Sequence, residues 1–160
     1  MKVENQEKLW DVIAPEWQEY KKVPSGRSQS FLEKCVGNVL DLGGGSGRHM
    51  VPIKDGKYYL LDFSKKMVKL AEKKADELGI NFEGIHSSMT DIPKEDELFD
   101  YAICVSSLHS VEGEENRLKS VQELYRVLKK GGEGYIGVWN FNSKRFNQKN
   151  GKEKLVGWRD

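Results

Sequence analysis

The sequence has few cysteines and no long apolar run. Its only two cysteines, Cys35 and Cys104, lie far apart, with no Cys-x-x-Cys pair and no histidine cluster beside them. This spacing argues against a metal site or a redox pair and predicts that both thiols are buried in apolar packing. No stretch reaches the roughly eighteen apolar residues that a membrane helix needs, and the N-terminus lacks the apolar segment of a signal peptide. We therefore expect a soluble, cytoplasmic protein with no membrane partner.

The chain also lacks an excess of charge of one sign. It carries 26 Lys and Arg against 25 Asp and Glu, for a formal net charge of +1. The overall charge therefore gives no basic footprint typical of nucleic-acid binding. Internal repeats and low-complexity linkers are absent too, and 160 residues suffice for one hydrophobic core. The sequence thus predicts a single domain over residues 1–160.

What the chain does contain is an alternation of helical and strand-like segments, which is typical of a parallel sheet covered by helices. We predict helices over 4–20, 26–34, 65–78 and 114–130, and strands over 38–42, 57–62, 81–86, 100–105 and 134–139. Ser64 is the expected cap and Gly79 the expected stop of the third helix. Gly131 and Gly132 are expected to end the fourth helix, whose last turn holds two lysines. After these segments only 154–159 is strand-like, so the C-terminal strands look incomplete.

The most informative motif is Asp41-Leu42-Gly43-Gly44-Gly45-Ser46-Gly47, which follows an apolar strand. Its pattern predicts a strand, a glycine turn and a helix start, where the backbone can approach a ligand and offer free N–H groups. Asp62, at the end of the next strand, can accept both hydroxyls of a ribose. Arg48 occupies the place of the third glycine of a dinucleotide site, and no Gly-Lys-Ser/Thr closes a P-loop. A plain glycine turn in an unrelated α/β domain remains the alternative.

This glycine motif with an acid on the next strand resembles class I S-adenosylmethionine (SAM) methyltransferases. The resemblance implies an α/β, Rossmann-like sheet with helices on both faces and SAM as cofactor. By the same resemblance, Asp41 fixes the turn through its backbone or contacts the SAM amino group, and Asp62 holds the ribose. Phe63 and Met89 are expected beside the adenine, and Ser88 replaces an acid that many relatives have there. The implied cofactor residues are Asp41, Gly43, Gly44, Gly45, Arg48, Asp62, Phe63, Ser88, Met89 and Ser106.

Segments 9–17, the glycine loop with Arg48, 105–109 and 155–158 together are similar to the methyltransferases that esterify a carboxymethyl group on the wobble uridine of tRNA. Within this set, 9–17 and 105–109 are the segments that favour this family. Two positions differ, since this chain has His109-Ser110 where relatives often have His-His, and Lys21 where they have arginine. The resemblance implies tRNA as a partner, together with a small zinc-binding activator protein that adds to the sheet edge. Strand 81–86 is the expected edge.

Methylating a carboxylate needs positioning more than a general base, because the nucleophile is already ionised at neutral pH. Lys21, Arg48 and His109 are candidates to hold it, and Lys21 and His109 are the catalytic candidates. His109 can instead simply end its strand, and Lys21 can be a solvated surface charge. The basic tail over 144–159, with interspersed aromatics, suits RNA phosphates and an unpaired base. It can equally be a solvated arm.

Three functions therefore stay open: a methyltransferase acting on a tRNA uridine, a small-molecule methyltransferase, and a catalytically silent SAM-binding subunit. All three share one organisation of the chain. Helices in 1–36 cover the cofactor and acceptor side, 37–140 forms the cofactor-binding core, and 141–160 is the basic C-terminal segment.

Overall fold

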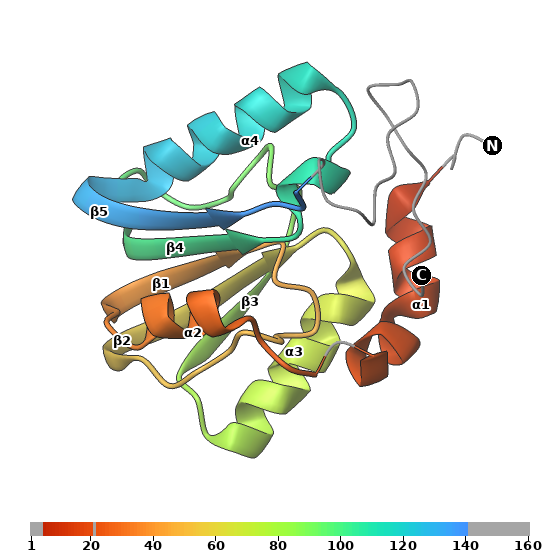
Figure 1. Cartoon of the computed structure of the whole chain (residues 1–160), viewed down its shortest axis with the longest axis horizontal. Coiled ribbons are helices and arrows are strands. Elements are labelled where there is room, and N and C mark those ends of the chain that lie inside the picture. Colours follow the sequence, from red (N-terminus) through yellow and green to blue (C-terminus); the bar gives the residue numbers. More distant parts are fainter. Residues whose placement is uncertain (1–4, 21, 141–160) are drawn as a thin grey trace.

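The computed structural model describes residues 5–20 and 22–140, and its centre is one parallel sheet (Figure 1). The five strands are β1 (Val36–Leu42), β2 (Lys54–Asp62), β3 (Phe82–His86), β4 (Phe99–Val105) and β5 (Leu128–Gly137). They lie in the order β3-β2-β1-β4-β5, and every neighbouring pair is parallel. The predicted parallel sheet is thus confirmed, and β3 is an edge strand within the described residues, as expected.

Four helices accompany the sheet: α1 (Gln6–Tyr20), α2 (Gly26–Leu32), α3 (Lys65–Leu78) and α4 (Glu114–Val127), with a short 3-10 turn, η1, at Leu108–Ser110. The predicted signals around α3 are confirmed. The Ser64 hydroxyl accepts a hydrogen bond from the Met67 N–H at 3.2 Å, so it satisfies one of the unpaired donors of the first turn. Gly79 ends the helix in the left-handed conformation, with φ 62°.

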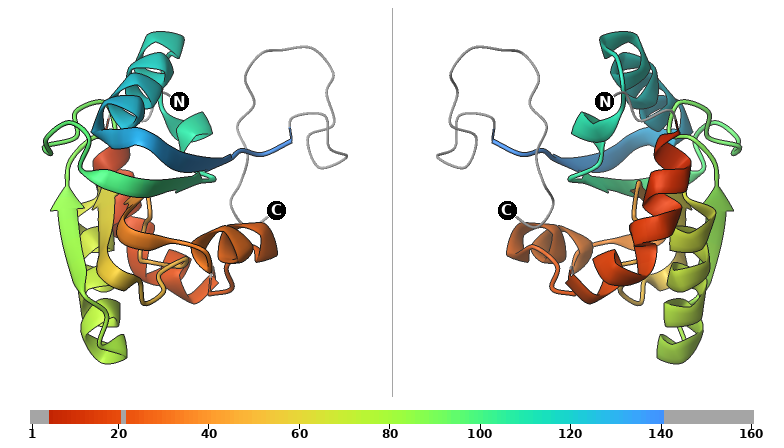
Figure 2. Two further views of the ribbon diagram at one scale, coloured as in Figure 1. Left: turned by 90° about the vertical axis from the view of Figure 1, so that its left-hand side faces the viewer. Right: turned by 90° about the vertical axis from the view of Figure 1, so that its right-hand side faces the viewer.

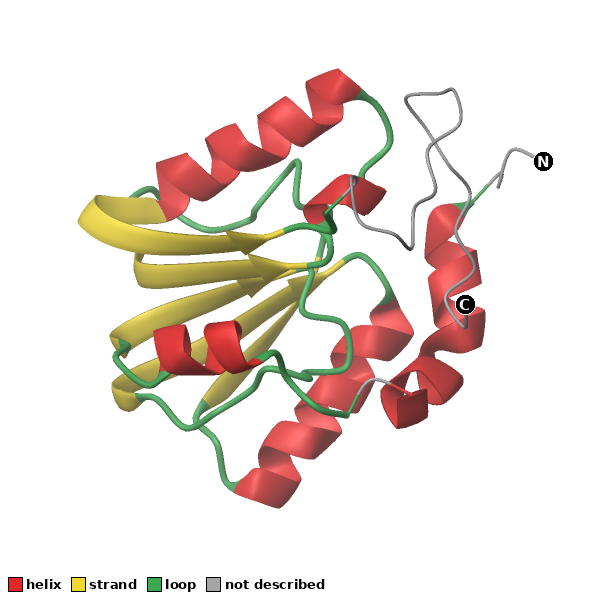
Figure 3. Cartoon of the chain, in the orientation of Figure 1, coloured by secondary structure: helices red, strands yellow, loops and turns green. Residues whose placement is uncertain are grey.

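Helices cover both faces of the sheet (Figure 3), and one buried cluster lies on each face. One packs strand residues against α2 and α3 and includes Cys35. The other packs the opposite strand face against Leu124 and Val127 of α4 and includes Cys104. Both cysteines are buried and free, as predicted. The buried stretches of β1, β2 and β4 supply most of the strand residues in these clusters, whereas β5 is largely exposed.

The boundary between α4 and β5 differs from the prediction. The helix ends at Val127 and β5 begins at Leu128, so Gly131 and Gly132 lie within the strand, where the pairing with β4 shifts register. Gly131 takes φ 81°. Lys129 donates to the Asp100 carboxylate at 2.7 Å in place of serving the helix end. Pairing with β4 therefore overrides the local preference for helix in this segment.

Helix α4 exposes a large part of its apolar surface. Leu118 is 59% exposed and Tyr125 is 83% exposed, whereas Leu124 and Val127 are buried. The face of α4 that enters the core also carries the fully buried Ser120, whose hydroxyl donates to the Asn116 carbonyl.

The chain reverses direction across the sheet between β1 and β4, since β1 leads to β2 on one side and β4 lies on the other. In open parallel sheets a ligand binds beyond the carboxyl ends of the strands at such a point. Helix α1 crosses this edge and lies beside α3, as the side views show (Figure 2). Among the described helices, none is long and apolar enough to cross a membrane.

Candidate cofactor site

The glycine turn follows β1 and is held by the neighbouring strand. The N–H groups of Gly43 and Gly44 both donate to the Leu61 carbonyl, at 2.7 and 3.2 Å. Gly43 has φ 71°, and a Cβ there would lie 2.6 Å from the Ser107 Cβ. The Ser107 hydroxyl in turn donates to the Gly43 carbonyl at 2.7 Å. Glycine is therefore required at position 43 for both its backbone angle and its space.

The expected helix after the glycine turn is absent. Residues 43–49 form consecutive turns, and the next regular element is β2. The Lys74 ammonium of α3 donates to the Gly47 carbonyl at 2.6 Å and ties down the far end of these turns. Any free N–H groups offered to a ligand therefore come from the turns themselves and not from a helix start.

Asp62 ends β2 with its carboxylate facing the turn. One oxygen accepts the Gly45 N–H and the other accepts the Ser64 N–H, each at 2.9 Å. A carboxylate has about four acceptor positions, so each oxygen keeps one for a ligand hydroxyl. Burial raises the pKa of Asp62 to about 6, and the two N–H bonds oppose that rise. A ribose diol fits this remaining acceptor capacity.

Asp41 lies behind the turn and is 1% exposed. Its carboxylate accepts the Tyr58 hydroxyl at 2.8 Å, and a Cβ on Gly44 would lie 2.6 Å from it. Burial raises the pKa of Asp41 to about 7. Its side chain is not part of the cavity wall, so the arrangement supports a role in shaping the turn over direct contact with a ligand.

A cavity of about 330 Å³ opens at the carboxyl ends of the strands. One wall is polar and contains the glycine turn, Asp62 and Ser106. The other wall contains Trp10 and Trp17 of α1, whose rings meet edge to face at 5.2 Å, and Trp139 after β5. Predicted residues that line the cavity are Gly43, Gly44, Gly45, Arg48, Asp62, Phe63, Ser88, Met89 and Ser106.

Helix α1 is fastened over this cavity by Asp11. The Asp11 carboxylate accepts the Ser64 hydroxyl at 2.6 Å and the Lys66 N–H at 3.1 Å, and the first of these bonds lowers the pKa of Asp11. Ser64 also donates its N–H to Asp62. The covering helix and the carboxylate at the cavity floor are thus joined through one residue.

Arg48 and His49 form a polar pair in the cavity wall. An Arg48 Nη lies 3.2 Å from the His49 Nε2. His49 is 4% exposed, and burial together with the Arg48 charge lowers its pKa to about 4. Neutral His49 therefore accepts from Arg48 at pH 7, which leaves Arg48 as a cation facing the cavity. The sequence alone favours packing or surface for His49, and its place in the wall is a finding of the structure.

Of the two catalytic candidates, His109 is described by the structure and Lys21 is not. The His109 ring stacks on Trp139 with centroids 4.5 Å apart and lies behind that cavity residue, while Ser110 and Val111 reach the wall. Its Nδ1 is buried with no hydrogen-bond partner among the described residues, and burial lowers its pKa. Lys21 and the tail over 141–160 lie outside the described residues.

Other cavity residues escaped the sequence reasoning. Trp10 and Trp17 lie in the predicted helix 4–20 and were not predicted to line a site, although their seven-residue spacing puts both on one helix face. Ser107 is the second residue after the end of β4, where functional polar residues gather in parallel folds, and this position was the available signal. Asn116 enters the wall from α4 and carries no signal in the sequence.

Comparison with known proteins agrees with this geometry. A family model described as a methyltransferase domain matches residues 39–132. A tRNA (carboxymethyluridine(34)-5-O)-methyltransferase of Arabidopsis thaliana is 28% identical over 134 residues, which are 82% of this chain and 32% of that protein. A demethylmenaquinone methyltransferase of Oceanobacillus iheyensis is 32% identical over 100 residues, which are 59% of this chain and 41% of that protein. The chain therefore spans less than half of either relative.

Solved structures share the fold. A SAM-dependent methyltransferase of Thermotoga maritima superposes with a TM-score of 0.63 at 26% identity, covering 87% of this chain and 64% of that one. A chain described as a methyltransferase, in complex with the Haloferax volcanii Trm112 methyltransferase activator, gives a TM-score of 0.66 at 22% identity, covering 86% and 62%. The second likeness concerns the fold alone.

Proposed function

Since this chain belongs to the family of SAM-dependent methyltransferase domains, we propose that it methylates a carboxymethyl group on a modified tRNA uridine. The observation that carries the proposal is that Asp62, the glycine turn to which it is hydrogen-bonded and three tryptophans line one cavity. The relative from Arabidopsis supports the acceptor.

In the proposed pose the Asp62 oxygens accept the ribose hydroxyls, and Gly43 to Gly45 face the methionine end of SAM. Phe63, Ser88 and Met89 form the adenine wall. Ser88 already bonds within its own turn, because its hydroxyl accepts the Thr90 N–H at 3.2 Å and pairs with the Thr90 hydroxyl. The loss of the usual acid at this position therefore leaves shape and backbone groups to recognise the adenine.

Transfer is a direct displacement. An acceptor carboxylate oxygen attacks the sulfonium methyl carbon, the methyl–sulfur bond breaks, and its electron pair stays on sulfur as S-adenosylhomocysteine (SAH) leaves. The product is a methyl ester, and no proton moves. The chain's task is to hold an anion near the methyl group, and the half-buried Arg48 is the described cation in the cavity wall. In this proposal His109 supports Trp139, and Lys21 is a second cation.

A small-molecule acceptor is the second candidate, supported by the likeness to a demethylmenaquinone methyltransferase. A flat ring on such an acceptor could pack against the rings of Trp17 and Trp139 in the cavity wall. A silent SAM-binding subunit is the third. The same cofactor site serves all three, so only the acceptor distinguishes them.

The test is transfer of a labelled methyl group from SAM. We expect label in tRNA that carries the carboxymethyl group, with ester lability to mild base, and less label in unmodified tRNA. An Arg48→Gln variant is expected to lose about 10-fold or more of the transfer rate, as when one electrostatic contact to a reacting group is lost.

Two further arms separate the alternatives. Label in a small-molecule extract with none in tRNA would contradict the tRNA acceptor. Tight SAM binding with transfer to neither, in the presence of a zinc-binding activator, would show a silent subunit. We propose β3 as the docking edge for such an activator, because its outer side has no strand partner among residues 5–20 and 22–140.

Asp11→Ala is expected to weaken SAH binding about 3- to 10-fold, because the mutation removes two hydrogen bonds that fasten α1 over the cavity. Titration calorimetry measures the change. The matched control is Glu19→Ala. Glu19 lies on the same helix as Asp11 and forms an exposed ion pair with Lys22, so its loss is expected to change little. Equal affinities for the wild type and Asp11→Ala would contradict a role for α1 in covering the cofactor.

A further inference from the structure

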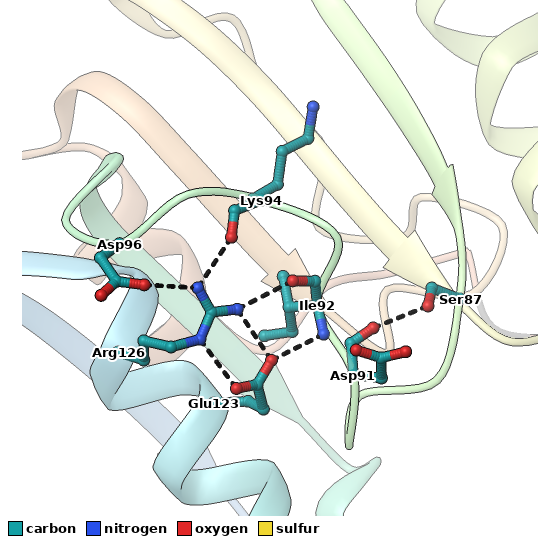
Figure 4. Close-up of polar contacts among 7 residues, drawn as sticks. All are labelled: Ser87, Asp91, Ile92, Lys94, Asp96, Glu123 and Arg126. Atoms are coloured by element: carbon teal, nitrogen blue, oxygen red, sulfur yellow. Dashed lines mark hydrogen bonds and ion pairs between the residues drawn. The ribbon is translucent and has the colours of Figure 1, made fainter.

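The segment between β3 and β4 crosses the sheet face without forming a regular helix. Such a segment needs partners for its backbone groups, because buried unpaired groups are costly. Two side chains of α4, Glu123 and Arg126, supply these partners (Figure 4). We infer that the Glu123–Arg126 pair is a positioning device for the adenine wall of the cofactor site. This inference rests on the proposed placement of adenine against Ser88 and Met89.

Arg126 acts as a fork with three partners in the segment. Its guanidinium donates to the carbonyls of Ile92 and Lys94, both at 2.8 Å, and to the Asp96 carboxylate at 2.7 Å. The backbone of Arg126 takes part as well, since its carbonyl accepts the Glu97 N–H at 3.0 Å. A planar guanidinium can serve several fixed acceptors at once in a way that a lysine cannot.

Glu123 holds the same segment from the same face of α4, and we call the Glu123–Arg126 pair the clamp. It accepts two bonds from Arg126 at 2.8 Å and the Ile92 N–H at 2.8 Å. Both backbone groups of Ile92 are thereby held by one ion pair. The Arg126 bond lowers the pKa of Glu123 to about 2 and raises that of Arg126, so the pair stays ionised over the range in which the protein is handled.

Ile92, which the clamp holds, lies only three residues after Met89 of the cavity wall. The side chain of Ile92 is 2% exposed and packs in the same core cluster that Met89 joins. The Asp91 N–H donates to the Ser88 carbonyl at 3.0 Å, and the Ser87 hydroxyl donates to the Asp91 carbonyl at 2.7 Å. A shift of Ile92 is therefore expected to displace the turn on which Ser88 and Met89 line the cavity.

Helix α4 also reaches the other end of the site. Asn116, in its first turn, lines the cavity, and its amide donates to the Glu112 carbonyl at 2.9 Å. Helix α4 therefore contacts the site at two places, through Glu123 and Arg126 near its last turn and through Asn116 in its first turn.

The test compares SAH with S-inosylhomocysteine, in which oxygen replaces the adenine amino group. The wild type is expected to prefer SAH. Arg126→Gln is expected to weaken SAH binding about 10-fold and to reduce the preference about 3-fold or more, because the wall is no longer held in register. Arg126→Lys, which keeps the charge without the fork, is expected to recover folding stability but not the preference. Calorimetry with both ligands gives the ratio.

Arg117→Gln is the matched control, because Arg117 lies on the same helix and bonds a single carbonyl, that of Val111, at 2.9 Å. It is expected to keep the preference. A preference that is unchanged in both Arg126 variants, or lowered equally by Arg117→Gln, would overturn the inference. So would equal binding of the two nucleosides by the wild type.

A Met89→Ala variant separates failure of the clamp from failure of the proposed cofactor pose. If Met89→Ala lowers the preference and Arg126→Gln does not, the clamp is wrong and the pose stands. If neither changes the preference, adenine does not lie against this wall, and the pose fails together with the inference.

Discussion

Gly56→Ala is expected to cost about 3 kcal/mol of folding stability or more, which lowers the melting temperature of a chain of this size by roughly 6–12 °C. A Cβ at this position would lie 1.7 Å from the Gly37 carbonyl oxygen and 2.1 Å from its carbon. Both atoms belong to backbone, so no side-chain rotation can relieve the clash. Thermal unfolding followed by circular dichroism measures the effect.

The neighbouring strand cannot move aside easily. Gly37 lies at the start of β1 with φ 80°, and its own Cβ position is closed by the Asp100 carboxylate at 2.4 Å. The Asp100 carboxylate also accepts the Asn38 N–H at 2.8 Å. Relief of the clash therefore requires separation of β1 and β2, whose ends carry the glycine turn and Asp62.

Gly26→Ala is the matched control, because Gly26 begins α2 without a left-handed backbone angle, and a Cβ added there would have no heavy atom within 4 Å. Alanine is expected to leave the melting temperature unchanged or to raise it slightly, through helix propensity. If Gly56→Ala melts together with the wild type, the close approach of β1 and β2 at this point is wrong.

Asp62→Asn is expected to weaken SAH binding about 10- to 100-fold, the range for loss of hydrogen bonds to a charged group. An amide offers one acceptor oxygen in place of two, and its NH₂ would face either the Gly45 or the Ser64 N–H, both now bonded at 2.9 Å. Titration calorimetry at pH 7.5 or above (about 1.5 units beyond the pKa) gives the change with the wild-type carboxylate fully ionised.

The pH dependence has a sign that identifies the group. Burial raises the pKa of Asp62 from 3.8 to about 6, and ribose hydroxyls favour the ionised form. Wild-type affinity for SAH is therefore expected to be full above the raised pKa and to fall as the pH drops through about 6. Without ligand, the contribution of Asp62 to folding stability changes with pH in the opposite direction. Its raised pKa stabilises the fold below 3.8, and that stabilisation is lost as the pH rises through about 6.

Asp62→Asn is expected to abolish this dependence. Asp55→Asn is the control, because Asp55 is an exposed carboxyl with φ 53°, which asparagine also adopts. A wild-type affinity that stays constant between pH 5 and 8 (roughly the range around neutrality) would count against Asp62 as the ribose ligand.

Local rules in the sequence were enough for much of the fold. The alternation of helical and strand-like segments predicted all five strands, because each strand contributes apolar residues to one of the two core clusters. Ser64 and Gly79 predicted both ends of α3, because capping depends only on residues within one turn. The glycine turn and Asp62 predicted the floor of the cavity for a similar reason, since their roles follow from backbone freedom and from the end of a strand.

Only the tertiary structure decided the rest, because those features depend on residues far apart in the chain. Pairing with β4 made the predicted end of α4 a strand, and the position of α1 in the fold made Trp10 and Trp17 part of the cavity wall. Trp139 lines the cavity and contacts His109, and Arg126 donates to partners about thirty residues away. The sequence by itself determined where the backbone turns and where a carboxylate stands, whereas the spatial meeting of distant side chains determined what surrounds them.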